Sequence, residues 1–222
     1  MKPFFAILFI VPLIFTSCNG DGNSDDAETT VYVHTPPSLP EEIYEKLAPG
    51  DIIIRKGNGP LSYHLMNNTK EDYSHCGIIV KEGEEWKVIH TIGGSASEES
   101  IDGMQTIDLD EFVAHAADSN LFICRPIFVD SAGPKVAAGA YEYLEAGAPF
   151  DHSFSLYTPE KLYCSELLYY IFKDVAGKNI FEVIKKHKSY ILMFGTFFDE
   201  EKFEPVFHLK PNKKDWYILH ED

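Results

Sequence analysis

Residues 74–91 decide the fold, and they read SHCGIIVKEGEEWKVIHT. Two apolar stretches rich in β-branched residues flank a charged segment, which is the pattern of two antiparallel strands joined by a turn. We predict strands over Ser74–Val80 and Trp86–Thr91, connected by a charged loop of five residues, Lys81–Glu85. The segment therefore predicts a β-hairpin.

This hairpin carries one histidine near each of its outer ends. With a five-residue loop, His75 and His90 lie opposite one another, and this pairing places both imidazole rings on one face. Gly77 shares that face and leaves a gap beside His75, where a helix end could approach. Such a pair supplies a base and a second polar group that holds the base in one tautomer. Each histidine alone is more often a structural strand residue, and a register slip of one residue would separate the rings.

The other predicted elements fall into blocks of helices and strands. Helix starts are indicated by capping residues, and helix ends by glycines such as Gly147 and Gly177. Separate blocks with hairpin links indicate an α+β fold with a largely antiparallel sheet packed against helices. Helices are predicted over Glu41–Leu47, Asp108–Ala116 (with a capping box of Asp108 and Glu111), Ala132–Ala146 and Pro159–Val175, and strands over Asp51–Arg55, Leu121–Pro126, Pro205–Leu209 and Trp216–Leu219.

Composition narrows the class of protein. The chain has 222 residues, a formal net charge of −16 and 45% hydrophobic residues. A charge of this sign repels phosphate backbones, so no nucleic-acid partner is expected. The acidity would suit a cationic ligand, although a solvated acidic surface is the more common reason for it. Residues 41–222 are long enough for one domain with a substantial core.

The N-terminus has the pattern of an export signal. Lys2 precedes an apolar run, Pro3–Phe15, that is too short to span a bilayer, and Thr16-Ser17-Cys18 resembles a bacterial lipobox, from which Phe15 departs because Leu is usual there. We predict a lipoprotein signal peptide over residues 1–17, a lipid on Cys18 and a flexible tether over residues 18–40. The anchor would place the protein in the cell envelope, on the outer membrane, facing the periplasm or the outside. A simply secreted form is the alternative.

Three cysteines remain after Cys18, namely Cys76, Cys124 and Cys164. An odd number leaves at least one thiol free, and without a CxxC pair or an HxxxH segment no structural zinc site is expected. Cys164 lies in the first turn of its predicted helix, where the helix dipole and free backbone N–H groups favour a thiolate. A buried cysteine is nevertheless most often a small hydrophobic residue. Cys76 is interpreted in that way, because it alternates with His75 onto the opposite strand face.

Four segments together point to a family. In order along the chain they resemble the signatures of the permuted papain-like amidases, the YiiX-like branch of the NlpC-type cysteine peptidase superfamily, in which the histidine strand precedes the cysteine helix. The resemblance covers about residues 48–172. The segments are Gly50-Asp51-Ile52-Ile53, Tyr73 to Val80, Phe150 to Phe154, and Leu162 to Leu167.

The resemblance implies a circularly permuted papain-like fold of the α+β class and a thiol mechanism without a metal or organic cofactor. It implies that Cys164 is the nucleophile, that His75 is the base and that His90 is the third polar residue. Phe150 stands where the family often has Tyr, so no phenol acts there. Glu166 is expected to be structural, and Asp51 to hold the turn before its strand.

The function implied by the resemblance is a cysteine-dependent amidase or peptidase. The expected substrate is a peptide or amide, with peptidoglycan peptides foremost because a lipid anchor would hold the protein in the cell envelope. Two alternatives remain open. One is an acyltransferase or hydrolase that acts on acyl lipids, and the other is a catalytically silent, lipid-anchored binding module.

Overall fold

A six-stranded sheet organises the part of the chain that this computed structural model describes, residues 36–94, 102–156, 158–186 and 189–210. The strand order is β4-β3-β2-β1-β5-β8, and every neighbouring pair is antiparallel. A separate two-stranded sheet pairs β6 with β7. The strands are β1 (Ile52–Arg55), β2 (His75–Glu82), β3 (Glu85–Ile92), β4 (Gly103–Asp108), β5 (Leu121–Pro126), β6 (Val183–Lys186), β7 (Ser189–Leu192) and β8 (Phe203–Leu209).

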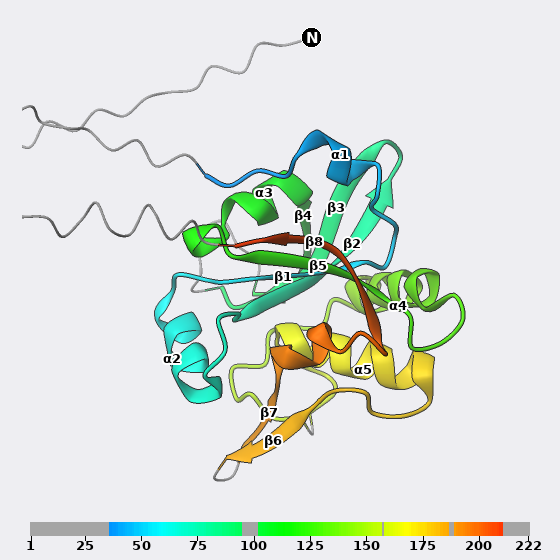
Figure 1. The fold of residues 1–222 in the computed structure, drawn as a ribbon. Helices are drawn as coiled ribbons and strands as arrows, with labels where there is room; N and C mark the ends of the chain where they lie inside the picture. The colour runs from blue at the N-terminus through cyan, green and yellow to red at the C-terminus, as the bar shows by residue number, and fades with distance from the viewer. Residues whose placement is uncertain (1–35, 95–101, 157, 187–188, 211–222) are drawn as a thin grey trace, which may run out of the picture. The chain divides into compact units, whose positions relative to one another are not determined.

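Helices cover both faces of the large sheet. Figure 1 shows α4 and α5 on one side of it and α1 and α3 on the other. This arrangement confirms the α+β class with an antiparallel sheet packed against helices. The helices are α1 (Glu41–Tyr44), α2 (Pro60–Thr69), α3 (Leu109–Ala114), α4 (Ala132–Ala146) and α5 (Cys164–Ala176), with short 3-10 turns η1 (Ala117–Ser119) and η2 (Phe194–Phe198).

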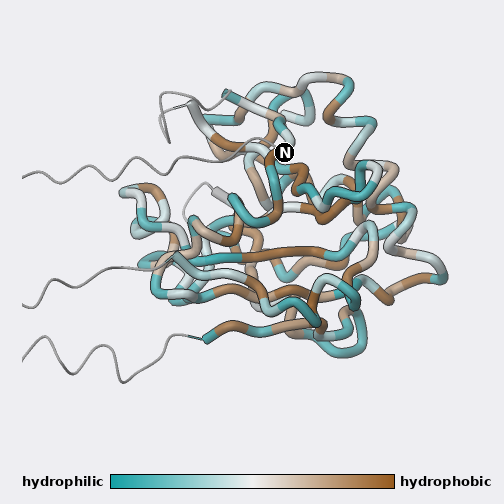
Figure 2. Tube along the Cα trace, turned by 90° about the horizontal axis from the view of Figure 1, so that it is seen from above, coloured by the Kyte–Doolittle hydropathy of each residue, from teal (hydrophilic) through white to brown (hydrophobic). Residues whose placement is uncertain are grey.

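The core has two parts because neighbouring strand residues point to opposite faces of the sheet. In β1, Ile52 and Ile54 pack with α4 and α5, whereas Ile53 packs with α1 and α3; all three are fully buried. Figure 2 shows hydrophobic residues along the inner strands and mainly hydrophilic ones in the loops. A strand that is apolar on both faces therefore marks the middle of the sheet.

The two long helices test the predicted boundaries. The bounds of α4 are those predicted, and Gly147 ends it in the left-handed conformation with φ of +64°. Gly177 ends α5 in the same way, with φ of +70°. The predicted start at Pro159 is wrong, because Leu162 forms a β-bridge with Phe150 and the helix begins only at Cys164.

The hairpin loop is shorter than predicted. Lys81 pairs with Trp86 and Glu82 with Glu85, so only Gly83 and Glu84 form the turn. Gly83 has a positive φ of +63°, which two-residue hairpin turns require. The charged residues continue the strands because this end of the hairpin is exposed to solvent.

Other elements differ from the sequence prediction. Helix α1 ends at Tyr44, β8 begins two residues before the predicted Pro205, and α2, β4, β6 and β7 were not predicted. Helix α3 starts after Asp108 as expected, but the capping box is absent, since the Asp108 carboxylate accepts a hydrogen bond from Lys87 instead. The strand predicted at 216–219 lies outside the described residues.

The turn before β1 is held as the sequence predicts. The Asp51 carboxylate accepts a hydrogen bond of 2.8 Å from the Ala48 N–H and forms an ion pair with Arg125. Gly50 has φ of +91°, and a side chain there would overlap the backbone of Gly133 at the start of α4. These contacts fix β1 against α4.

The described residues start near the end of the segment expected to be a tether. Leu39 is buried in the α1/α3 side of the core. Residues 1–35, with the expected signal peptide and Cys18, lie outside the described residues. No helix that the structure describes is long and apolar enough to cross a membrane.

Candidate active site

The two predicted histidines lie together, although their register differs from the expected one. The pairing of Ile78 with Ile89 carries His90 to Gly77, so the predicted direct pairing of His75 with His90 is wrong by two residues. A shift of two preserves the face, because strand side chains alternate with a period of two. The rings therefore lie diagonally, and a hydrogen bond of 3.0 Å joins Nε2 of His75 to Nδ1 of His90.

Gly77 has a different role from the one expected. A Cβ on Gly77 would lie 2.4 Å from a Val88 methyl carbon and 3.2 Å from the His90 Cβ. The space beside this glycine is therefore filled by strand β3 and not by a helix end. Any side chain at this position would collide with the residues that hold His90 in place.

The histidine pair is enclosed by its neighbours. The His75 ring stacks on Phe112 of α3 at 5.4 Å, and His90 meets the same ring edge-on at 5.5 Å. Nε2 of His90 lies 3.1 Å from the side-chain amide of Gln105 on β4. One nitrogen of the pair, Nδ1 of His75, forms no hydrogen bond with a described residue, so it is the nitrogen left for chemistry.

The surroundings keep both imidazoles neutral. Burial is the largest cause, and it lowers the pKa of His75 well below its ordinary value and that of His90 to about 3. The positive charge of Arg55 lowers both values further. A neutral imidazole can accept a proton, which a histidine that acts as a base requires.

Cys164 is the first residue of α5, and it lies against the start of β2. Its sulfur is 3.9 Å from the carbonyl oxygen of Ser74, the residue before His75. The neighbouring Cys76 side chain lowers the pKa of Cys164 most, and the backbone N–H groups of Cys76, Ser165 and Cys164 lower it further. Among the described residues no hydrogen bond joins this sulfur to the His75 ring.

Cys76 is more than the core residue that was expected. It is buried on the α5 side of β2, opposite His75, as strand alternation predicts. Its thiol nevertheless neighbours Cys164, and burial together with this contact raises the pKa of Cys76 well above its ordinary value. One thiol of the pair is thus kept protonated while the other is favoured as a thiolate. The third, Cys124, is buried on β5.

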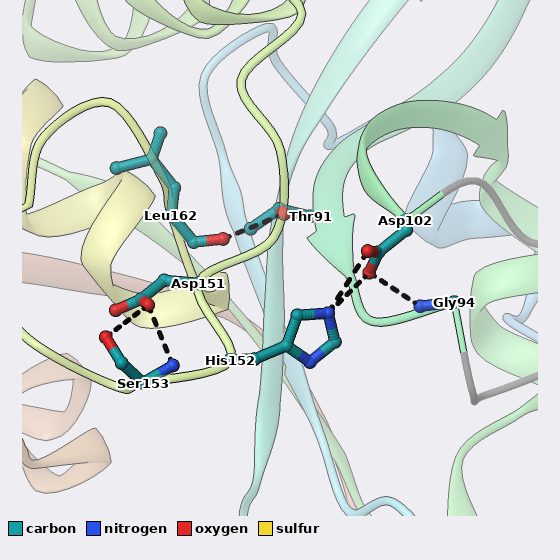
Figure 3. A network of polar contacts seen from close by, with 7 residues as sticks. All are labelled: Thr91, Gly94, Asp102, Asp151, His152, Ser153 and Leu162. Atoms are coloured by element: carbon teal, nitrogen blue, oxygen red, sulfur yellow. Dashed lines mark hydrogen bonds and ion pairs between the residues drawn. The ribbon is translucent and has the colours of Figure 1, made fainter.

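The connection that leads into Cys164 is fastened to the ends of β3 and β4. The Thr91 hydroxyl donates a hydrogen bond of 3.0 Å to the Leu162 carbonyl, and His152 pairs with Asp102 at 3.0 Å (Figure 3). The Asp102 carboxylate also accepts the Gly94 N–H at 2.9 Å. These contacts hold the residues just before Cys164 beside the strand that carries His90.

A turn within the same connection is stabilised by Asp151. Its buried carboxylate accepts hydrogen bonds from the N–H and hydroxyl of Ser153 and from the N–H of Ser155. A pocket of about 440 Å³ opens beside this turn. Its lining residues carry both signs of charge, although most of the lining surface is apolar: Phe150, Asp151, His152, Ser153, Thr158, Glu160 and Lys161.

Two site residues were missed by sequence reasoning, Arg55 and Gln105. Arg55 pairs directly with His75 across β1 and β2, and Gln105 pairs with His90 across β4 and β3. A charged residue that directly follows three buried isoleucines was a signal for Arg55. The signal for Gln105 was absent because strand β4 itself was not predicted.

Glu166 has the structural place that was expected. It is fully buried in the first turn of α5, where its carboxylate accepts a hydrogen bond of 3.4 Å from the Tyr163 N–H. The other carboxylate oxygen has no partner among the described residues. Burial raises the pKa of Glu166 to about 8.

We expect Glu166→Gln to remove a pH dependence of stability. Between pH 5 and 8 the folded chain keeps a proton on Glu166 that the unfolded chain has lost. The free energy of unfolding therefore falls as pH rises, by at most about 1.4 kcal/mol per pH unit. Thermal unfolding across this range should show a shallower decline for the variant than for the wild type. The exposed Glu84→Gln should retain the wild-type slope, and equal slopes in all three proteins would contradict the prediction.

The fold and this site can be compared with known proteins. The sequence profile described as "permuted papain-like amidase enzyme, YaeF/YiiX, C92 family" matches residues 46–191, well over half of the chain. This chain belongs to the permuted papain-like amidase family. The family supports the circularly permuted papain-like fold and, in general terms, a cysteine amidase.

Two Escherichia coli proteins are similar to this permuted papain-like amidase. It is 26% identical over 136 residues to the uncharacterized protein YiiX of strain K12, covering 60% of this chain and 61% of that protein. The alignment therefore spans about three fifths of the relative's length. The crystal structure of "metalloprotein yiiX" from strain O157:H7 has a TM-score of 0.60 at 21% identity over 73% of this chain and 98% of that one. That likeness supports the fold alone.

Proposed function

We propose that this protein is a cysteine-dependent amidase or peptidase that hydrolyses amide bonds of cell-wall peptides. In this proposal Cys164 is the nucleophile, His75 is the base, and His90 orients His75. The 3.0 Å hydrogen bond between the two buried imidazoles carries the proposal, because it is the base-and-orienting-group arrangement that a thiol nucleophile requires. The Cys164 sulfur lies 3.9 Å from the carbonyl oxygen of Ser74, the residue that precedes His75 in the chain, and this position supports the proposal further.

The reaction follows from these positions. Nδ1 of His75 takes the proton of the Cys164 thiol, and the thiolate attacks the amide carbonyl carbon. Backbone N–H groups at the start of α5, which already lower the pKa of this thiol, stabilise the oxyanion. The leaving amine takes the proton from His75, and water then hydrolyses the thioester with His75 again acting as base. Contacts between nucleophile and base often tighten only when substrate binds, which fits their separation in the free protein.

The tautomer of His75 depends on Gln105. For Nδ1 of His75 to be a free base, Nε2 of His75 must donate to His90, and Nε2 of His90 must donate in turn. A side-chain amide oxygen from Gln105 accepts that last hydrogen bond after a half-turn of the amide, whose two ends occupy nearly the same positions. Gln105 thus completes a chain of hydrogen bonds that begins at the proposed base.

The substrate class and the location are the finer parts of the proposal. The pocket beside the turn at Asp151 has side chains of both charges on its wall, Glu160 and Lys161, which supports a zwitterionic substrate such as a peptide. A lipid on Cys18 would anchor the protein to the outer membrane, within reach of peptidoglycan peptides. We accordingly propose a cell-envelope lipoprotein.

A second candidate function is hydrolysis or transfer of acyl groups from lipids. One observation favours it, a second pocket of about 310 Å³ that is mainly apolar. Five phenylalanines from β5, η2 and β8 line it, namely Phe122, Phe197, Phe198, Phe203 and Phe207. The third possibility, a binding module without catalytic activity, would require Cys164, His75 and His90 to be present but catalytically inactive.

The Escherichia coli protein of known structure is described as a metalloprotein. In the part of this chain that the structure describes, no three His, Cys, Asp or Glu side chains are grouped so that they could hold a metal ion. The described residues therefore do not fit such a site, and no step of the proposed mechanism is assigned to a metal.

The test is an incubation of residues 36–222 with purified muropeptides and, separately, with an acyl-lipid ester, with products identified by mass spectrometry. The proposal expects cleavage of a peptide amide bond that Cys164→Ala abolishes. Lipid turnover that depends on Cys164 would instead support the acyl-group candidate. Turnover of neither substrate would favour the binding module.

A further inference from the structure

Arg55 is a buried cation at the end of β1 without an acidic partner. Its side chain is 8% exposed, and in the described part of the chain no carboxylate forms an ion pair with it. One terminal nitrogen donates to the carbonyl of His115, the guanidinium lies 4.7 Å above the Phe112 ring, and Nε has no hydrogen-bond partner among the described residues. Burial of a charge without an ion-pair partner costs free energy, so another interaction of this charge has to offset that cost.

The groups around Arg55 are those of the proposed active site. His75 is its direct neighbour across the β1–β2 pair, and both residues contact Phe112. The titratable groups whose charges interact with this cluster are His75 from β2, His90 from β3, His115 at the end of α3 and Cys164 from α5. Of these, only the Cys164 thiolate can carry a negative charge.

The electrostatic directions agree with this placement. The positive charge of Arg55 lowers the pKa of His75 and of His90. Burial lowers the pKa of Arg55 itself to about 10, and the Cys164 thiolate opposes that shift. Arg55 and the thiolate therefore stabilise one another, while Arg55 and a protonated histidine repel one another.

We infer that Arg55 is the fixed countercharge of this site: it keeps the resting histidine pair unprotonated, so that His75 can accept the Cys164 proton, and it stabilises the thiolate that then forms. This inference rests on the proposed roles of Cys164 and His75. Arg55 is a positioning residue in this arrangement, since it acts on the thiol and the base and not on the substrate. His75 would then remain unprotonated at pH values where an isolated histidine is already protonated.

The test is the pH dependence of Cys164 alkylation by iodoacetamide, read for each cysteine by mass spectrometry of peptides. Arg55→Met should raise the pKa of the thiol and slow labelling near pH 6.5 by about three- to tenfold, because fewer molecules carry a thiolate. Arg55→Lys, which keeps the charge, should lie between this variant and the wild type. Arg125→Met, in the same sheet but paired with Asp51, should change stability and leave the labelling profile unchanged. A folded Arg55→Met protein with the wild-type profile would overturn the inference.

A measurement on the unaltered protein covers the case in which Arg55→Met does not fold. Histidine NMR titration should show His75 neutral from pH 7 to pH 5. A His75 that is protonated near or above pH 6.5 would refute the inference. Neither experiment uses a substrate, so a failure to find amidase activity would leave both readouts intact and would count against the proposed function alone.

Discussion

Cys164→Ala should lower kcat/KM for the cleaved amide by about 10⁴-fold or more, because removal of the nucleophile closes the covalent route altogether. The fold should survive this change. Cys164 is only partly buried, and alanine is well tolerated in a first helical turn. Initial rates on the muropeptide that the wild type cleaves, together with the thermal unfolding midpoint, are the measurements.

Cys124 provides the matched control for this experiment. It is a fully buried thiol on β5 of the six-stranded sheet, and burial raises its pKa well above the ordinary value. Cys124→Ala should reduce stability by removing packed atoms and leave kcat/KM within a few-fold of the wild type. Equal losses of activity in the two variants would mean that Cys164 is required for folding and not for chemistry.

His75→Ala should be the second most damaging change, with a loss of about 10²- to 10⁴-fold in kcat/KM, as expected for removal of a general base. The effect should be on the chemical step, so kcat should fall while KM changes little. The loss should shrink at high pH, where solvent removes the thiol proton without help. Rates between pH 6 and 10 measure this recovery.

His90 separates orientation of the base from base catalysis itself. His90→Ala leaves His75 in place but removes its 3.0 Å hydrogen bond, so the loss should be smaller than for His75→Ala. His90→Gln can still accept a hydrogen bond from His75 and should recover part of the activity. If His90→Ala is as active as the wild type, His90 has no role in the site.

The hairpin shows how far sequence reasoning reaches. The expected five-residue loop placed His75 and His90 on one face, and the two rings do share a face although both the loop length and the direct pairing were wrong. The register error was two residues, which strand periodicity tolerates, whereas an error of one would have separated the rings. Charged residues occur both in turns and at the solvent-exposed ends of strands. A charged stretch therefore does not specify which of its residues form the turn.

Elements without a strong periodic pattern were missed. Helix α2 begins with Pro60, mixes polar with apolar residues and buries only Thr69, and half of β4 is partly exposed, so neither shows a clear apolar face. Their absence from the prediction hid Gln105, which reaches His90 only because β4 pairs with β3. The role of Arg55 was missed for a related reason. Its pairing with His75 depends on the register between β1 and β2, which neither strand's sequence specifies by itself.

The sequence by itself determined the α+β class, the family, the extent of α4 and the identity of the proposed nucleophile and histidine pair, because periodicity, end signals and ordered signatures are local properties of the chain. Only the tertiary structure decided the diagonal geometry of the histidines, the contact of Cys76 with Cys164 and the place of Arg55 beside them. These features depend on strand register and on which helix covers which face. The strand register and the position of each helix are determined by contacts between residues far apart in the chain, which together bury the apolar surface of the sheet.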